Sequence, residues 1–141
     1  YRLYFLGGVS TDANIALRFN DDTGNNYSHN VSVFQGGTVS SGTSVTASTD
    51  RGYFGYISGT SANAHFFECT IYDMPIGINS YRGWTAHGHS KTVFDGNQTQ
   101  TSLASGMYAA TNNKLTKITV ITSTGNINAD SYFLLEGLMQ T

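Results

Sequence analysis

The chain has 141 residues, a length that suits one domain with its own hydrophobic core. Only 11% of the residues are charged, against about 25% in a typical domain, so we expect no nucleic-acid partner. No apolar run approaches the roughly 18 residues of a membrane helix, so we expect no membrane insertion. The single cysteine, Cys69, cannot form an internal disulfide.

The N-terminal half predicts β-strands separated by polar turns. The first strand is expected at residues 1–6 and the second at 15–20, where Ile15, Leu17 and Phe19 alternate with other residues. Successive strand side chains point to opposite faces, so this alternation predicts one buried face. Further strands are expected at 27–34 and 52–58. The Gly36-Gly37 and Ser41-Gly42 pairs between them are typical of turns.

The C-terminal half continues this pattern. In the strand predicted at 64–73, Phe67, Cys69 and Ile71 share one face, and Glu68 and Thr70 lie opposite. The remaining strands are expected at 80–94, 107–110, 117–121 and 132–138. Residues 99–110 are the best candidate for a short helical turn, although they read equally well as a strand. Roughly eight to ten strands in one all-β domain, residues 1–141, indicate a sandwich or barrel.

The two ends of the chain carry the strongest pattern. Residues 1–6 and 15–20 read as a matched pair of strands, as do 117–121 and 132–138, and small polar residues bridge each pair. The first pair contains a Tyr-x-Leu opening, a Thr-Asp turn, a Leu-Arg-Phe strand and an Asp-Gly-Asn loop. The residues of this motif are Tyr1, Leu3, Thr11, Asp12, Leu17, Arg18, Phe19, Asp22, Gly24, Asn25 and Tyr27. The closing motif comprises Ile118, the turn 122–127, Phe133, Leu135, Gly137 and Leu138.

In combination, these motifs resemble a module of tailed-bacteriophage virion proteins. The resemblance implies an antiparallel, jelly-roll-like β-sandwich displayed on a tail fibre, a baseplate or the head, and it implies assembly as a homotrimer. Because the chain opens on Tyr1 rather than Met, we expect a fragment or C-terminal domain of a longer virion protein. Glu136 departs from the module, which usually has an aromatic residue there.

Two aromatic clusters beside glycines are candidates for contact with a host-surface glycan. Exposed aromatic side chains stack on sugar rings, and an arginine beside them offers planar hydrogen bonding. The candidate residues are Tyr53, Tyr56, Tyr81, Arg82 and Trp84. The alternative is that these side chains form core or a subunit interface, because large aromatics are usually buried.

Two short motifs are candidates for a metal site. His87 and His89 should project from one face of a strand, but two imidazoles are too few for a closed site without ligands from other chains. Asp21 and Asp22 lie in an oxygen-rich loop that lacks the spacing and the bidentate glutamate of a helix-loop-helix calcium site. The alternatives are polar surface residues and a tight turn stabilised by Asp and Asn side chains.

The sequence holds no strong catalytic or cofactor motif: no nucleophile elbow, no phosphate-binding glycine loop and no His-Glu-x-x-His. We therefore expect a non-enzymatic virion domain without a cofactor, which displays loops at the particle surface for attachment to a host glycan. Two alternatives remain: a decoration domain that reinforces the capsid or head, and a glycan-degrading enzyme, which would need two facing carboxylates.

Overall fold

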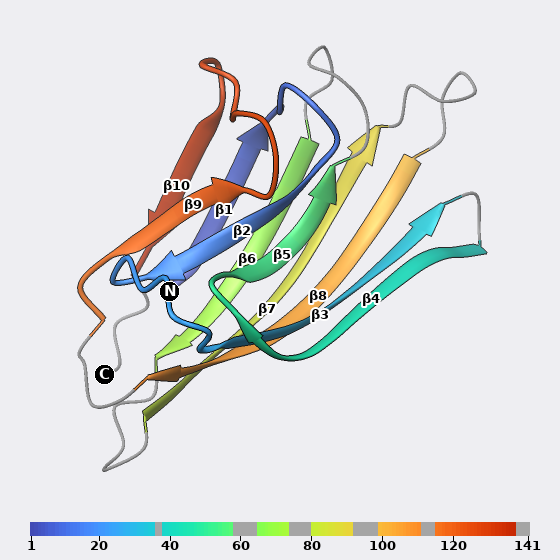
Figure 1. The fold of residues 1–141 in the computed structure, drawn as a ribbon. Helices are drawn as coiled ribbons and strands as arrows, with labels where there is room; N and C mark the ends of the chain where they lie inside the picture. The colour runs from blue at the N-terminus through green and yellow to red at the C-terminus, as the bar shows by residue number, and fades with distance from the viewer. Residues whose placement is uncertain (36–37, 58–64, 74–79, 92–98, 111–114, 138–141) are drawn as a thin grey trace.

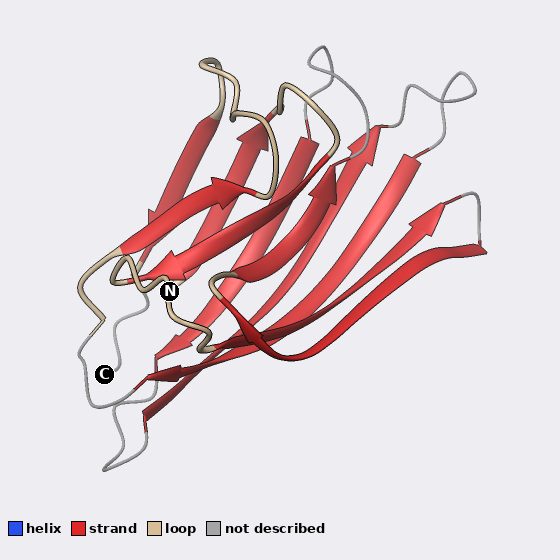
Figure 2. Cartoon of the chain, in the orientation of Figure 1, coloured by secondary structure: helices blue, strands red, loops and turns tan. Residues whose placement is uncertain are grey.

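The computed structural model describes residues 1–35, 38–57, 65–73, 80–91, 99–110 and 115–137. These ranges form strands joined by loops, and they contain no helix (Figure 2). The strands are β1 (Arg2–Gly7), β2 (Ala13–Phe19), β3 (Tyr27–Gln35), β4 (Thr38–Thr49), β5 (Gly52–Ile57), β6 (His65–Asp73), β7 (Ser80–Lys91), β8 (Thr99–Ala110), β9 (Ile118–Thr122) and β10 (Tyr132–Glu136). Within the same ranges, no helix long and apolar enough to cross a bilayer is found.

The strands form two antiparallel sheets that pack face to face (Figure 1). The large sheet has seven strands in the order β10-β1-β6-β7-β8-β3-β4, and the small sheet has three in the order β5-β2-β9. The small sheet covers the inner face of the large sheet and leaves the outer face of the large sheet open. The predicted all-β sandwich is therefore confirmed.

The strand pairing is nested, as in a jelly roll. β1 pairs with β10 in the large sheet, β2 with β9 in the small sheet, and β3 with β8 in the large sheet again. The two matched pairs predicted at the chain ends therefore do not pair internally. The polar residues after β1 and after β9 carry the chain from one sheet to the other, so each strand finds its partner at the opposite end of the sequence.

One open alternative is decided and one local prediction was wrong. Of the two readings left open for residues 99–110, the strand is the one observed: they form β8, which is paired with β7 and β3 along its length. The predicted turn at Ser41-Gly42 is not found, because the pair lies within β4 and pairs with Val33 and Ser32. A Ser/Thr-rich segment gives no hydrophobic alternation, so its pairing at the sheet edge had no signal in the sequence. Gly36-Gly37 lies outside the described residues.

The predicted core faces are confirmed. Ile15, Leu17 and Phe19 on β2 are fully buried, and so are Phe67 and Cys69 on β6. Burial raises the pKa of the Cys69 thiol to about 12, so the thiol stays neutral inside the core.

Two large aromatic rings fill the core by lying against glycines. A Cβ atom added at Gly106 would stand 2.0 Å from Trp84 Cζ2, and one added at Gly52 would stand 2.3 Å from Trp84 Cη2. Phe67 is held in the same way, because Cβ atoms at Gly55 and Gly88 would stand 2.2 and 2.1 Å from its ring. The glycines therefore provide the space that these rings occupy between the sheets.

Two histidines are buried in the core without hydrogen bonds. His29 on β3 is 4% exposed, and His65 on β6 is fully buried. None of their four ring nitrogens has a partner among the described residues. Burial lowers the pKa of both imidazoles, so both are neutral in the folded protein at neutral pH.

Candidate functional site

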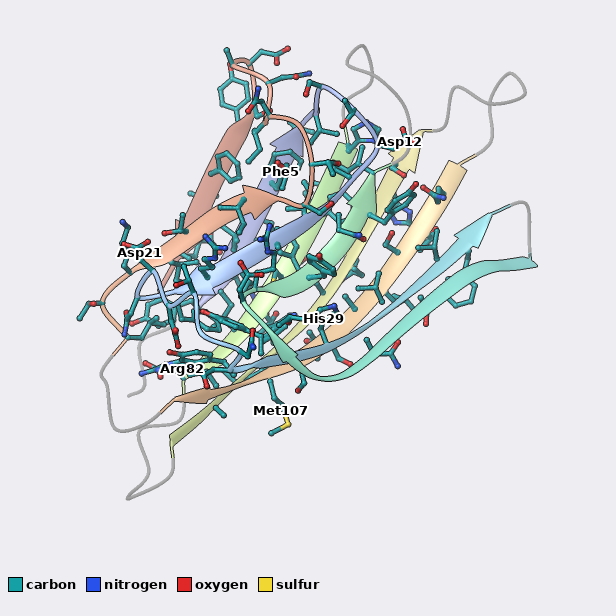
Figure 3. The ribbon with its side chains drawn as sticks, viewed as in Figure 1. Phe5, Asp12, Asp21, His29, Arg82 and Met107 are labelled. Carbon is teal, nitrogen blue, oxygen red and sulfur yellow. The ribbon has the colours of Figure 1, made fainter. Side chains whose placement is uncertain are left out.

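The outer face of the large sheet carries the most distinctive group of exposed side chains. One register row crosses four neighbouring strands and places Tyr72 of β6, Gly83 of β7, Met107 of β8 and Ser28 of β3 side by side. Tyr72 is 49% exposed and Met107 is 50% exposed. Figure 3 shows Met107 pointing away from the small sheet, whereas His29 and Arg82 point into the sandwich. Two large apolar side chains therefore stand on the open face with a glycine between them.

The next row on the same face is polar and uncharged. It runs through Thr70, Thr85, Ser105 and Asn30 on the same four strands. Hydroxyl and amide groups can both donate and accept hydrogen bonds. The two rows together therefore set an apolar strip beside a strip of neutral hydrogen-bonding groups.

An open groove follows these rows. Its volume is about 500 Å³. The outward side chains and the glycine that line it are Ser28, Asn30, Tyr72, Gly83, Thr85, Ser105 and Met107. None of these side chains carries a charge at neutral pH, so the groove suits an uncharged polar ligand.

The ring of Tyr72 lies along the sheet surface instead of standing upright. Its Cδ2 atom would be 3.9 Å from a Cβ at Gly83, and its hydroxyl oxygen is 3.4 Å from Thr85 Oγ1. The ring thus spans diagonally from one register row to the next, over the position where Gly83 has no side chain. One face of the ring is therefore presented to solvent, in the orientation that stacking on a flat apolar surface requires.

The structure corrects the glycan-contact prediction for Trp84 and Arg82. Both side chains lie on the inner face of β7 and are buried, at 1% and 2% exposure. Trp84 Nε1 donates a hydrogen bond to the backbone oxygen of Tyr53 at 3.1 Å, and Arg82 Nε donates to Asp73 Oδ1 at 2.7 Å. Neither side chain can reach a glycan, so the alternative of core residues is confirmed for both.

Two of the other three predicted glycan residues, Tyr53 and Tyr56, are not brought into the groove. Tyr53 and Tyr56 lie on β5 of the small sheet, half-buried and packed against the core, with the Tyr53 ring 4.3 Å from that of His29. Tyr81 lies in β7, but its side chain is outside the described residues. Glycan contact by these three tyrosines stays a prediction.

His87 and His89 project together from the outer face of β7, as the alternation predicts. His87 Nε2 is 3.8 Å from Glu68 Oε2, and His89 Nδ1 is 3.2 Å from Thr101 Oγ1. The described part of the chain contains no group of three or more His, Cys, Asp or Glu side chains placed to hold a metal ion. A metal at this pair would need ligands from elsewhere, and we do not propose one.

The carboxylates of Asp21 and Asp22 both accept hydrogen bonds from other residues of the chain. Asp21 accepts hydrogen bonds from Lys117 Nζ at 2.6 Å and Thr119 Oγ1 at 2.8 Å, and these bonds lower its pKa. Asp22 accepts bonds from the Gly24 amide at 2.7 Å and from Asn26 and Tyr108. Burial alone would raise the pKa of Asp22, but the three bonds together lower it. The bonds from Gly24 and Asn26 stabilise the turn, and those from Lys117, Thr119 and Tyr108 join it to neighbouring segments.

Comparisons with protein-family models, with curated proteins and with solved structures find no match. The candidate binding site is therefore inferred from the geometry of this structure alone. Sequence reasoning missed Tyr72 and Met107, although a signal was present. Each is an apolar residue on the polar face of its strand: Tyr72 shares a face of β6 with Glu68 and Thr70, and Met107 shares a face of β8 with Ser105.

Proposed function

We propose that this chain is a non-enzymatic domain of a tailed-bacteriophage virion, displayed at the particle surface, which attaches to an uncharged host-surface glycan through the outer face of its large sheet. The observation that carries the proposal is the groove in which the flat, half-exposed ring of Tyr72 lies beside a row of neutral hydroxyl and amide groups. Sugar rings have apolar faces and hydroxyl edges, so they match both parts of such a surface.

The uncharged lining argues for a neutral ligand. A sugar acid or a phosphate would require arginine, lysine or backbone amides within reach, and none of the described side chains that line this groove is cationic. Neutral polar groups on a rigid sheet also form wet, hydrogen-bonded contacts that bind without long-range attraction. The virion setting rests on the motifs at the two chain ends that resemble phage virion modules.

The arrangement of carboxylates supports a binding role over hydrolysis. A glycosidase needs two facing carboxyl groups about 5–10 Å apart at the sugar. Asp50 is paired with Arg18 and Arg51, and Asp73 is paired with the buried Arg82. No carboxylate lines the groove among the described residues.

The test is binding to an array of neutral and acidic oligosaccharides, followed by calorimetry with the best neutral binder. In the variant Tyr72→Ala, loss of the stacking surface should raise the dissociation constant for the glycan by at least about 10-fold, equivalent to about 1.4 kcal/mol of binding free energy. Tyr4→Ala is the matched control, because Tyr4 also belongs to the outer face but lies on β1, outside the groove. Its affinity should equal that of the wild type.

Three results would count against the proposal: no binding to any glycan, equal loss in both variants, or release of reducing ends from the bound oligosaccharide. Purified domain that ignores every glycan but binds capsids would instead support the decoration function. Both tyrosine variants should keep the native fold, since neither side chain is part of the buried core.

A further inference from the structure

The outermost strand of the large sheet, β10, is apolar and exposed on both faces. Tyr132, Phe133, Leu134 and Leu135 are 72%, 45%, 54% and 49% exposed. β10 pairs with β1 along one edge, and no described strand pairs with its other edge. Free strand edges bind other strands, and proteins that keep them free use proline, lysine or a bulge. The segment Tyr-Phe-Leu-Leu-Glu has no proline or lysine, and its register with β1 is regular.

The sandwich is open behind this strand. A cleft of about 460 Å³ lies between the β10 end of the large sheet and β9, the edge of the small sheet. Apart from Lys117 and Thr119, the cleft is lined by the apolar side chains Leu3, Ile118, Val120, Ile127, Phe133 and Leu135. The hydrophobic core therefore reaches the surface at this end.

The apolar surface continues from β10 onto the outer face of its neighbours. Tyr132 lies in register with Leu6, and Leu6 with Phe66, which are 47% and 38% exposed. Together with the other three apolar residues of β10, they expose about 600 Å² of apolar surface, taking roughly 200 Å² for one large side chain. A stable interface buries about 800 Å² on each partner, and the four apolar β10 side chains, which adjoin the free edge, supply roughly half of that area.

The strand is complementary to itself. In an antiparallel pair centred on Leu134, that leucine faces its own copy, Phe133 faces Leu135, and Tyr132 faces Glu136. The single carboxylate of the strand then faces a tyrosine rather than a second carboxylate, so like charges do not meet. Phe133 and Leu135 of both copies would meet on the inner side, where each cleft opens.

We propose that β10 binds β10 of a second copy of this chain around a two-fold axis at Leu134. The pairing joins two large sheets into one continuous sheet, satisfies the free backbone edge of both strands, and joins the two open clefts into one apolar interior. A two-fold contact closes on itself and gives a dimer, which differs from the homotrimer that the resemblance to phage modules implies. The proposal stands independently of glycan binding.

The test uses opposite charges at the residue that faces its own copy. Wild-type protein should sediment as a dimer. Leu134→Lys and Leu134→Glu should each weaken the dimer at least about 100-fold, because two like charges then lie directly opposite. An equal mixture of the two variants should restore a dimer, since lysine then faces glutamate. Leu103→Lys is the matched control, because Leu103 is 48% exposed on the same face but lies on β8.

Several outcomes would overturn the proposal: a monomeric or trimeric wild type, a Leu134→Lys variant that remains a dimer, a mixture that fails to associate, or a Leu103→Lys variant that is as monomeric as the Leu134 variants. Emission of the buried Trp84 reports the fold of each variant independently of its mass. All three substitutions replace side chains that are about half exposed in the single chain, so the fold should be retained.

Discussion

Gly106→Ala tests the packing of the sandwich most directly. The added methyl would lie 2.0, 2.4 and 2.5 Å from three ring atoms of Trp84, where ordinary contacts between carbon atoms are about 3.5–4.0 Å. The ring cannot retreat freely, because Gly52 approaches it from the small sheet and the ring of Phe19 lies 6.1 Å away, edge to face. Moving the ring by an ångström would also stretch its 3.1 Å hydrogen bond to the backbone oxygen of Tyr53.

The cost combines overpacking and a weakened buried hydrogen bond. Overpacking a core costs about 1–3 kcal/mol, and a buried donor that loses its partner costs about 1–3 kcal/mol. We expect Gly106→Ala to lower the free energy of unfolding by about 3 kcal/mol, and the melting temperature by roughly 10 °C. Urea unfolding followed by tryptophan emission measures the first quantity, and calorimetry measures the second.

Gly83→Ala is the matched control on the neighbouring strand. Its methyl would lie 3.6 Å from the Gly106 carbonyl oxygen and 3.9 Å from Tyr72 Cδ2, both ordinary contacts. We expect a change in unfolding free energy below about 1 kcal/mol, because alanine fits here and has fewer unfolded conformations than glycine. Equal stability of Gly106→Ala and wild type, or equal losses in both variants, would refute the assigned position of Trp84.

The titrating groups give two further predictions. Burial lowers the folded-state pKa of His29 and His65 below 6.5, the value in the unfolded chain. The resulting stability is fully present above pH 6.5 and should be lost as the pH falls below it. The free energy of unfolding should decrease by up to about 1.4 kcal/mol per pH unit for each histidine. Urea midpoints for the wild type and for His65→Leu at about pH 7.5 and about pH 5.5 measure this loss, and an equal slope in both proteins would contradict it. Hydrogen bonds from Arg51, and then from Arg18 against the opposing effect of burial, lower the pKa of Asp50 from 3.8 to about 2. Asp50→Asn should therefore cost about 1–2 kcal/mol at neutral pH, with allowance for partial exposure, and this difference should disappear as the pH falls from 3.8 through about 2.

Alternation in the sequence predicted the faces of strands but not their neighbours. The faces of β2 and β6 followed from the positions of Ile15, Leu17 and Phe67, since a period of two needs no knowledge of the partner strand. The same rule places Arg82 on the face of Trp84, inside the sandwich. Alternation alone gave no reason to expect a buried arginine. The carboxylate that pairs with Arg82 belongs to Asp73 on β6, and only the register between β6 and β7 places it there.

Alternation could have marked Tyr72 and Met107 as apolar residues on polar faces, but it could not bring them together, because the candidate site is assembled across strands. Tyr72, Gly83 and Met107 are separate in the sequence and become neighbours only through the register of β6, β7 and β8. β10 shows the opposite limitation. The apolar residues Phe133 and Leu135 predict burial, and the fold instead leaves them at an edge, where the single chain has nothing to cover them among its described residues.

The nested pairing of strands also determines when the domain can be completed during synthesis. The Asn14 amide donates a hydrogen bond to Ser123 Oγ, 109 residues later in the chain. β1 and β2 leave the ribosome first, yet their outer neighbours β10 and β9 leave it last. The entropy of closing such long loops must be overcome before the contacts form, so folding should be slow. A nascent chain that stops before Ile118 would leave β1 and β2 each with a bare edge, ready to pair with a neighbouring chain.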